Sequence, residues 1–205
     1  MARPREYDDE LRRQLIDTAG RLLAAEGPAG LTTRRIATEV GTSTTAIYSL
    51  LGSKADLVRA MFVEGFARLA AALDAVPVED DPVEHLVQLG FAYHDSAMAS
   101  PHLYRVMFER PVPGFDPTPE EVLFSLSTLQ VLVDAVARVA ATGRFPGDPF
   151  EGALEMWALV HGITSIAVSG MAGPPERSRI HLERMMRAQV AGYAALGTAT
   201  EQERV

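Results

Sequence analysis

Residues 41–54 read GTSTTAIYSLLGSK, and the fold and function of the chain turn on this stretch. Six of the eight residues from 42 to 49 carry a hydroxyl group, and the aliphatic side chains are confined to Ala46, Ile47, Leu50 and Leu51. So few aliphatic residues pack a core poorly, yet this is not the Gly, Pro and Asp mixture of an ordinary loop. Its role therefore depends on the elements on either side of it.

Nearly every other segment has the pattern of a helix. Three starts, at Asp81–Glu84, Thr118–Glu121 and Asp148–Glu151, combine an N-cap residue, a proline at the first helical position and a glutamate at the third. The cap oxygen accepts an unpaired backbone N–H, the proline has none to lose, and the glutamate reaches back. Apolar spacing between such starts and the Gly/Pro stops predicts helices over residues 8–26, 32–39, 43–50, 53–76, 82–99, 101–109, 118–142, 149–171 and 176–196. No segment alternates strictly enough for a strand, so the predicted fold is all-α.

The second and third predicted helices are short and are joined through Gly41-Thr42. Two short helices with a tight glycine turn between them predict a helix-turn-helix. Gly41 would permit the left-handed backbone of the turn. The inner packing is expected from Ile36, Ala37, Val40, Ile47 and Leu50.

The hydroxyl groups are explained if this unit binds DNA. With the aliphatic residues facing inward, the outer surface carries Thr42, Ser43, Thr44, Thr45, Tyr48 and Ser49. The major groove of B-DNA admits an α-helix, and short hydroxylated side chains bond base edges and phosphates there. Thr33 and Arg34 would stand beside the groove, while Lys54 would offer its charge and free backbone N–H groups to a phosphate. The alternative is a Ser/Thr-rich solvated helix in an unrelated bundle.

Composition excludes several other kinds of site. The 205-residue chain has no cysteine, which rules out disulfides, zinc–thiolate sites, iron–sulfur clusters and cysteine nucleophiles. Its formal net charge is −8, but residues 1–54 hold eight Lys/Arg against seven Asp/Glu. DNA binding requires a basic surface only where the protein meets the phosphates. No apolar run approaches the roughly 18–20 residues of a membrane span and no signal peptide is present, so a cytoplasmic protein without a membrane partner is predicted.

The stretch LTTRRIATEVGTSTTAIYSLLGSKADLVRAMF, residues 31–62, resembles the DNA-binding segment of the TetR family of bacterial transcriptional regulators. The positions that match the family pattern are Thr33, Ile36, Ala37, Gly41, Ser43, Ile47, Tyr48, Gly52, Ser53, Lys54 and Leu57. One departure is Leu50-Leu51, which stands where the family usually has His-Phe. The phosphate contact of that histidine is therefore not carried over.

The resemblance implies a division of roles among these residues. Thr33 and Arg34 would contact the DNA backbone and a base edge, and Tyr48 and Lys54 would hold phosphates. The recognition helix would present to the bases Thr44, Thr45 and Ser49. The N-terminal arm, with Arg3 and Arg5, would reach along the backbone or into the minor groove.

The C-terminal part resembles the WHG-type subclass of the family through Trp157-x-x-x-His161-Gly162. In such regulators the last two long helices pair across a twofold axis, and the preceding helices enclose a small-molecule cavity. The resemblance therefore implies a homodimer through the helices near 149–171 and 176–196. The residues small enough for close contact there are Gly162, Ser165, Ala167, Ala188, Ala191 and Gly192.

Aromatic, histidine and methionine side chains share helical faces in the region of that implied cavity. The residues predicted to bind a ligand are Phe91, His94, Met98, His102, Tyr104, Met107, Phe108, Phe124, Trp157 and His161. Such a lining favours a small lipophilic or aromatic ligand oriented by His94 and His161. The alternative for each residue is core packing, with each histidine satisfied by one hydrogen bond.

The sequence thus predicts a TetR-type regulator with a helix-turn-helix DNA-binding domain at residues 1–54 and a helical ligand-binding and dimerisation domain at 55–200. By resemblance it would be a repressor that binds a near-palindromic double-stranded operator as a homodimer and is released by its ligand. An activator of the same family, or a helical ligand-binding or adaptor protein without sequence-specific DNA binding, are the alternatives. The five histidines lack metal-binding spacing, and no nucleophile elbow or phosphate loop occurs, so no enzyme, metal or cofactor is predicted.

Overall fold

The computed structural model describes residues 5–202, with side chains described for residues 8–174 and 176–196. Over that range the chain forms nine α-helices and no strand, so the all-α prediction is confirmed. The helices are α1 (Arg5–Glu26), α2 (Thr33–Val40), α3 (Thr44–Leu51), α4 (Lys54–Asp74), α5 (Pro82–Ala99), α6 (Pro101–Glu109), α7 (Pro119–Ala140), α8 (Pro149–Val168) and α9 (Pro175–Gln202). Their ends differ from the predicted ends by a few residues, most of all at α9, which continues to Gln202.

Three helices start with the predicted cap and proline, but the glutamate reaches back in only one of the three. Asp81 Oδ1 and Asp148 Oδ1 accept backbone N–H bonds at the starts of α5 and α8. At α7, Thr118 Oγ1 accepts from the Glu121 N–H at 3.3 Å, and Glu121 Oε2 accepts from the Thr118 N–H at 2.7 Å. Glu84 instead bonds to side chains beyond the cap, because partners on α5 and α9 lie within its reach.

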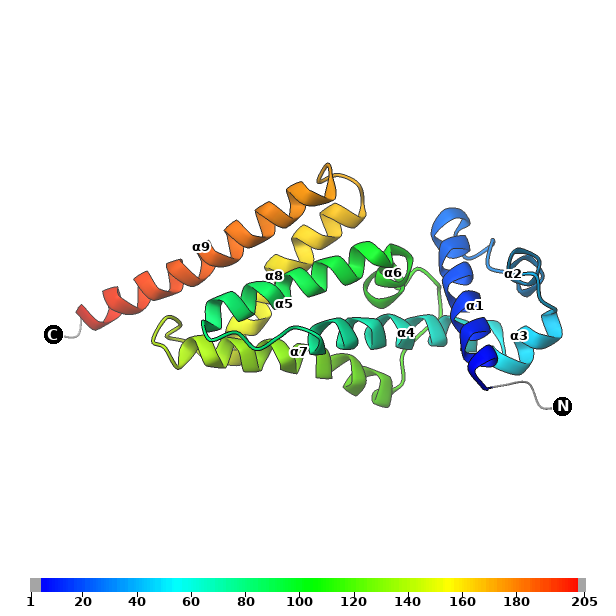
Figure 1. Ribbon diagram of the computed structural model, residues 1–205, viewed down its shortest axis with the longest axis horizontal. Helices are drawn as coiled ribbons and strands as arrows, with labels where there is room; N and C mark the ends of the chain where they lie inside the picture. The colour runs from blue at the N-terminus through cyan, green and yellow to red at the C-terminus, as the bar shows by residue number, and fades with distance from the viewer. Residues whose placement is uncertain (1–4, 203–205) are drawn as a thin grey trace. The chain divides into compact units, whose positions relative to one another are not determined.

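The chain divides into two compact units, and the first contains residues 5–67 and 100–122. In this unit 1, α1 contacts α2, α3 and α6. Figure 1 shows α1, α2 and α3 grouped together. Leu15 and Ile16 of α1, with Ile36 of α2 and Ile47 of α3, are at most 1% exposed and form the core of this group. Burial of these aliphatic side chains holds α2 and α3 against α1.

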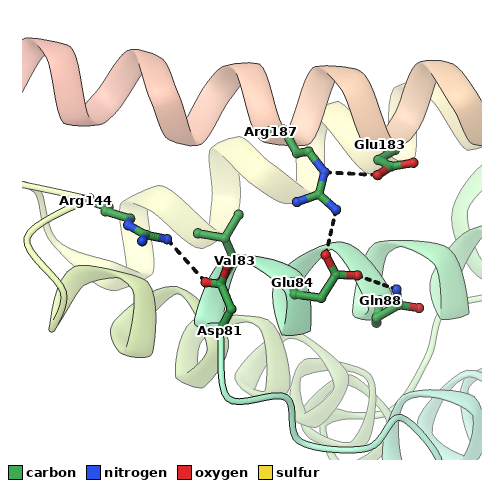
Figure 2. A network of polar contacts seen from close by, with 7 residues as sticks. All are labelled: Asp81, Val83, Glu84, Gln88, Arg144, Glu183 and Arg187. Carbon is green, nitrogen blue, oxygen red and sulfur yellow. Dashed lines mark hydrogen bonds and ion pairs between the residues drawn. The ribbon is translucent and has the colours of Figure 1, made fainter.

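The second unit contains residues 68–99 and 123–202, and its core lies between α5, α8 and α9, which contact one another. Arg187 of α9 links α5 to α9 by donating to Glu84 at 2.6 Å and to Glu183 at 3.0 Å (Figure 2). Gln88 donates to the other oxygen of Glu84 at 2.7 Å. This network lies at the edge of the α5–α9 contact in unit 2, where the ion-paired side chains are between one-third and one-half exposed.

Helix α7 is the one helix among the described residues that is long and apolar enough to cross a membrane by length and composition. Its most apolar window has a mean hydropathy of 1.6, and 22% of that window is buried. The prediction that no segment approaches a membrane span is therefore wrong for α7 by this measure. A core helix of a soluble protein passes the same test, and Asp134 and Arg138 place charge within α7, so this helix alone is weak support for a membrane partner.

Candidate nucleic-acid interface

The turn between α2 and α3 depends on one glycine. Gly41 ends α2 at φ 75° and ψ 34°, in the left-handed region that glycine adopts without a steric penalty. The N–H of Thr42 then donates to the carbonyl oxygen of Ala37 at 2.9 Å. Ser43 caps α3 by accepting from the Ala46 N–H at 3.1 Å. The predicted helix, tight glycine turn and second helix are therefore present in the structure.

The inward-facing residues of the two helices match the prediction at Ile36, Ala37 and Ile47, which are at most 5% exposed. Leu50 was expected to face inward as well, but it is only half-buried, and Leu51 is buried in its place. Positions 50 and 51 follow Ile47 by three and four residues, so helical spacing allows either to share its face, and the packing of α3 selects Leu51. Val40 is also half-buried rather than buried.

The residues predicted to contact DNA lie on the outer side of this motif. Those with exposed side chains are Arg34, Ser43, Thr45, Tyr48, Ser49 and Lys54, and those that are half-buried are Thr33, Thr42 and Thr44. Tyr48 is 56% exposed, a large aromatic ring left in water next to a row of hydroxyl groups. Amphipathic rings of this kind are common at binding surfaces, because one face is apolar and the tip forms hydrogen bonds. Arg3 and the side chain of Arg5, predicted to form an arm on the DNA, lie outside the described residues.

The two adjacent arginines of α2 have different surroundings. Arg35 forms a two-fold ion pair with Glu26, with N–O distances of 2.7 and 2.8 Å, and it also lies 3.4 Å from Glu39. Arg34 has no ion-pair partner among the residues with described side chains. The guanidinium of Arg35 is therefore neutralised inside the protein, while that of Arg34 remains available for an external anion.

The start of α4 contains both a positive and a negative group. Lys54 is exposed, and its Nζ donates to the carbonyl oxygen of Pro28. Asp56 Oδ2 accepts from the hydroxyl and the backbone N–H of Ser53 at 2.7 and 2.8 Å. These bonds, first from the hydroxyl and then from the backbone, lower the pKa of Asp56. Free backbone N–H groups at this helix start were predicted to bind a phosphate. The N–H of Ser53 is not one of them, because it donates to Asp56.

The ten residues predicted to bind a ligand are divided between the two units, and four of them lie in unit 1. His102 Nε2 lies 3.3 Å from Asp17 Oδ1 of α1, and a Cβ atom added at Gly20 would lie 2.4 Å from the His102 ring. His102 thus packs closely on α1. The other three are Tyr104 and Phe108, whose ring centroids are 5.0 Å apart, and Met107, which is 8% exposed.

Two of the predicted ligand residues in unit 2 link α5 to α9. His94 is 2% exposed, with Nδ1 3.0 Å from Asp95 Oδ1 and Nε2 2.8 Å from Ser178 Oγ. The guanidinium of Arg179 lies 4.0 Å from the centre of the Phe91 ring and is ion-paired to Asp95. For these two residues the geometry matches the core-packing alternative, because both ring nitrogens of the histidine are already within hydrogen-bond distance of protein groups.

The Trp157 and His161 side chains form an aromatic cluster with Tyr93 of α5. The hydroxyl of Tyr93 lies 2.9 Å from His161 Nδ1, and the Trp157 and His161 rings are 5.2 Å apart. Sequence reasoning missed Tyr93, although it lies between Phe91 and His94 on a helix already assigned to the site. The two remaining predicted ligand residues are Met98, which is half-buried, and Phe124, which is 36% exposed.

Five of the six small residues predicted for helix pairing lie on the outer side of α8 and α9. Ala188, Ala191 and Gly192 are exposed, and the half-buried ones are Gly162 and Ser165. Ala167 is 6% exposed and packs into unit 2, so it does not belong to that surface. Among the described residues no group of three or more His, Asp or Glu side chains could hold a metal ion.

Two family models match the sequence over the regions just described. The model of bacterial regulatory proteins of the tetR family matches residues 15–61, which contain α2, the turn and α3. The model of the tetracyclin repressor-like C-terminal domain matches residues 86–188. The second match alone covers half of the chain.

Whole-chain comparisons agree with these matches. The HTH-type transcriptional regulator Rv1816 of Mycobacterium tuberculosis is 24% identical, over 82% of this chain and 85% of its own length. A solved protein of unknown function from Rhodococcus sp. RHA1 is 28% identical, with a TM-score of 0.71 over 90% of this chain and 95% of that one. A putative tetR family transcription regulator from Shewanella sp. PV-4, 22% identical over 89% of this chain and 96% of that one, shares the fold with a TM-score of 0.66.

Proposed function

The chain belongs to the TetR family of bacterial regulatory proteins, and from that premise we propose that it is a ligand-released repressor. It binds a near-palindromic operator in double-stranded DNA as a homodimer. A small lipophilic or aromatic molecule lowers its affinity for that operator. The observation that carries the proposal is the outer surface of the motif, where α3 exposes hydroxyl groups and α2 exposes Arg34, which has no ion-pair partner among the described side chains.

The proposed contacts to bases come from the recognition helix α3. Thr44, Thr45 and Ser49 are short enough to let the helix backbone approach the floor of the major groove and to bond base edges. Arg34 enters from α2 and forms a bidentate bond with a guanine edge, the commonest specific contact of an arginine in the groove.

The remaining proposed DNA contacts go to the backbone. Tyr48, through its hydroxyl, and Lys54, through its charge, bind phosphates, with weaker hydrogen bonds from Thr33, Thr42 and Ser43. Such contacts position the protein but carry no sequence information. The proposed operator is part of the bacterial chromosome, which lies in the cytoplasm. We therefore propose that the protein acts in the cytoplasm. The family consists of transcription regulators, which fits a binding function rather than catalysis.

The proposed dimer uses the outer face of α8 and α9. Apart from its chain neighbours and the backbone of its own helix, a Cβ atom added at Gly162 or Gly192 would meet no atom within 4 Å, so packing does not require glycine at either position. The same two helices carry exposed apolar side chains, among them Ile166 of α8, four residues after Gly162, at 48% and Ile180 of α9 at 67% exposure. Exposed small and apolar residues on these two helices support close approach of a second copy across a twofold axis. Two recognition helices related by that axis would contact two half-sites of a near-palindrome.

The proposed ligand site is centred in unit 2 on Trp157 and His161, with Tyr93 as an added member. The Tyr93–His161 contact fixes the imidazole ring next to the indole, which supports stacking of an aromatic or lipophilic ligand with one polar anchor. Release from DNA requires that the ligand bind the two conformations of the protein with different affinity.

The test is selection of bound duplexes from random DNA, followed by titration of the selected duplex at two salt concentrations. A palindromic sequence bound by a dimer with a steep salt dependence is the expected result. The selected duplex then serves to screen aromatic and lipophilic compounds for release. Binding without any enriched sequence, or with a single half-site bound by a monomer, would overturn the proposal.

A further inference from the structure

One arginine ties α4 to the chain that follows α6. The Arg59 guanidinium is ion-paired to Glu121 and donates from Nη2 to the carbonyl oxygen of Asp116 at 3.5 Å. Its Cζ lies 5.7 Å from the centre of the Phe115 ring, and that ring packs on Phe62 of α4 at a centroid distance of 5.6 Å. All these residues belong to unit 1. The contacts of Arg59 with Phe115, Asp116 and Glu121 are called the Arg59 clasp below.

Glu121 serves two partners at once. Its carboxylate accepts the Thr118 N–H and closes the capping box of α7, and the same Oε2 atom is paired with Arg59. The side chain of Glu121 is 14% exposed and that of Arg59 is 36% exposed. Water and salt therefore screen this pair less than a fully exposed one. Because one oxygen makes both contacts, unfolding of the first turn of α7 also removes the ion pair from α4.

The recognition helix is joined to α4 through two residues only. Gly52 donates its N–H to the Tyr48 carbonyl oxygen at 3.1 Å, and Ser53 shares its reciprocal cap with Asp56. Arg59 follows one turn after that cap on the same helix. Because the connection is short and bonded at both residues, a movement of the first two turns of α4 carries α3 with it.

We infer that the Arg59 clasp positions the recognition helix for DNA, and that opening the clasp at the start of α7 lowers DNA affinity. The inference rests on the proposed DNA-binding function and names the residues that transmit a change to α3. Arg59 and Glu121 are positioning residues, because their charges pair with each other and not with a phosphate. A ligand or modification that disturbs the capping box of α7 would act on DNA binding through them.

The test measures affinity for the selected duplex in Arg59→Met, Glu121→Gln and the double variant. The amide oxygen introduced by Glu121→Gln still accepts the Thr118 N–H, so the cap is kept while the charge is lost. Each single variant should bind about threefold to tenfold more weakly, and the double variant no more weakly than the worse single variant. Arg144→Met, which breaks the exposed pair with Asp81 in unit 2, is the control and should bind like the wild type.

Salt dependence separates positioning from direct contact with DNA. The slope of log affinity against log salt should stay at the wild-type value in all three variants, whereas loss of a phosphate contact would lower it by about 0.9 per contact. Additive losses, a lowered slope or affinities equal to the wild type would overturn the inference.

Hydrogen exchange tests the clasp without DNA. Amides of residues 54–62 should exchange at least about threefold faster in Glu121→Gln than in Arg144→Met, because the clasp restrains this part of α4. Equal exchange would overturn the inference even if the wild type binds its duplex well. A wild type that selects no duplex, together with faster exchange in Glu121→Gln, would instead overturn the proposed function and leave the clasp as a restraint on α4.

Discussion

The Nζ atom of Lys54 lies 2.8 Å from the carbonyl oxygen of Pro28, so the lysine at the start of α4 holds the loop between α1 and α2. The bond joins residues 26 positions apart in the sequence. A lysine has three donors and can keep this bond while a second donor meets a phosphate. The structure therefore gives Lys54 a role in unit 1 in addition to its proposed role on DNA.

Lys54→Ala should weaken binding to specific and random duplexes by the same factor. The reason is that a phosphate contact carries no sequence information, and its loss lowers the salt slope by about 0.9 per contact. The measurement is titration of both duplexes at several salt concentrations. Lys54→Arg is the matched control, because it keeps the charge, and it should retain most of the slope. A Lys54→Ala variant that weakens only the specific duplex would contradict a phosphate role.

Arg34→Ala and Arg35→Ala should differ although the residues are adjacent. Arg34→Ala should relax the preference at one base pair of each half-site by about 1–3 kcal/mol, because a bidentate contact to a base edge is lost. Arg35→Ala should leave base preference unchanged, because its guanidinium is engaged by Glu26 and Glu39. Competition among duplexes with single base-pair changes measures both. The assignment fails if the two variants change the same base preference.

Gly162→Leu should convert the proposed dimer into a monomer without unfolding the chain. An added Cβ atom would meet no atom within 4 Å apart from its chain neighbours and the backbone of its own helix, and the leucine side chain would occupy the space proposed for the second copy. Sedimentation velocity measures the change of mass, and circular dichroism checks the helix content. Ala24→Leu, on the exposed surface of α1, is the control and should remain dimeric. If the Gly162→Leu variant remains dimeric, the dimer interface does not include this face of α8.

The network around Glu84 should make stability fall in acid (Figure 2). Hydrogen bonds from Arg187 and then Gln88 lower the pKa of Glu84 below its usual 4.5. A carboxylate with a depressed pKa in the folded state stabilises the fold above the unfolded pKa, and this contribution is lost as the pH falls through the folded pKa.

Glu84→Gln should therefore lose less stability than the wild type when the pH is lowered from about 6 to below 4. Because the Glu84 side chain is 35% exposed, solvent screening keeps the difference below about 1 kcal/mol. Urea unfolding at each pH measures it, and Glu176→Gln, an exposed carboxylate at the start of α9, is the comparison. If the free energy of unfolding falls with pH equally in the wild type and in Glu84→Gln, the Glu84–Arg187 pair does not contribute to the loss of stability in acid.

The helices and the recognition motif could be predicted from the sequence because their determinants are local. An N-cap, a proline and apolar residues three or four apart act within a few residues of each other, so Asp81 and Asp148 mark helix starts in any tertiary setting. The same applies to Gly41, whose left-handed backbone is required by the turn itself. Even there, helix phase was predicted with an error of one residue, and the structure buries Leu51 where Leu50 was expected.

The partners of polar side chains were decided only by the tertiary structure. The sequence places Glu39 four residues after Arg35, but the two-fold ion pair that neutralises the Arg35 guanidinium appears only when Glu26 of α1 is brought to α2. His94 and His102 are predicted to bind a ligand because polar groups among apolar ones suggest a pocket, and only the fold brings Ser178 and Asp17, each more than eighty residues away, within hydrogen-bond distance of them. Helix periodicity depends on neighbours along the chain, whereas the pairing of a buried polar group depends on which helices the fold brings together.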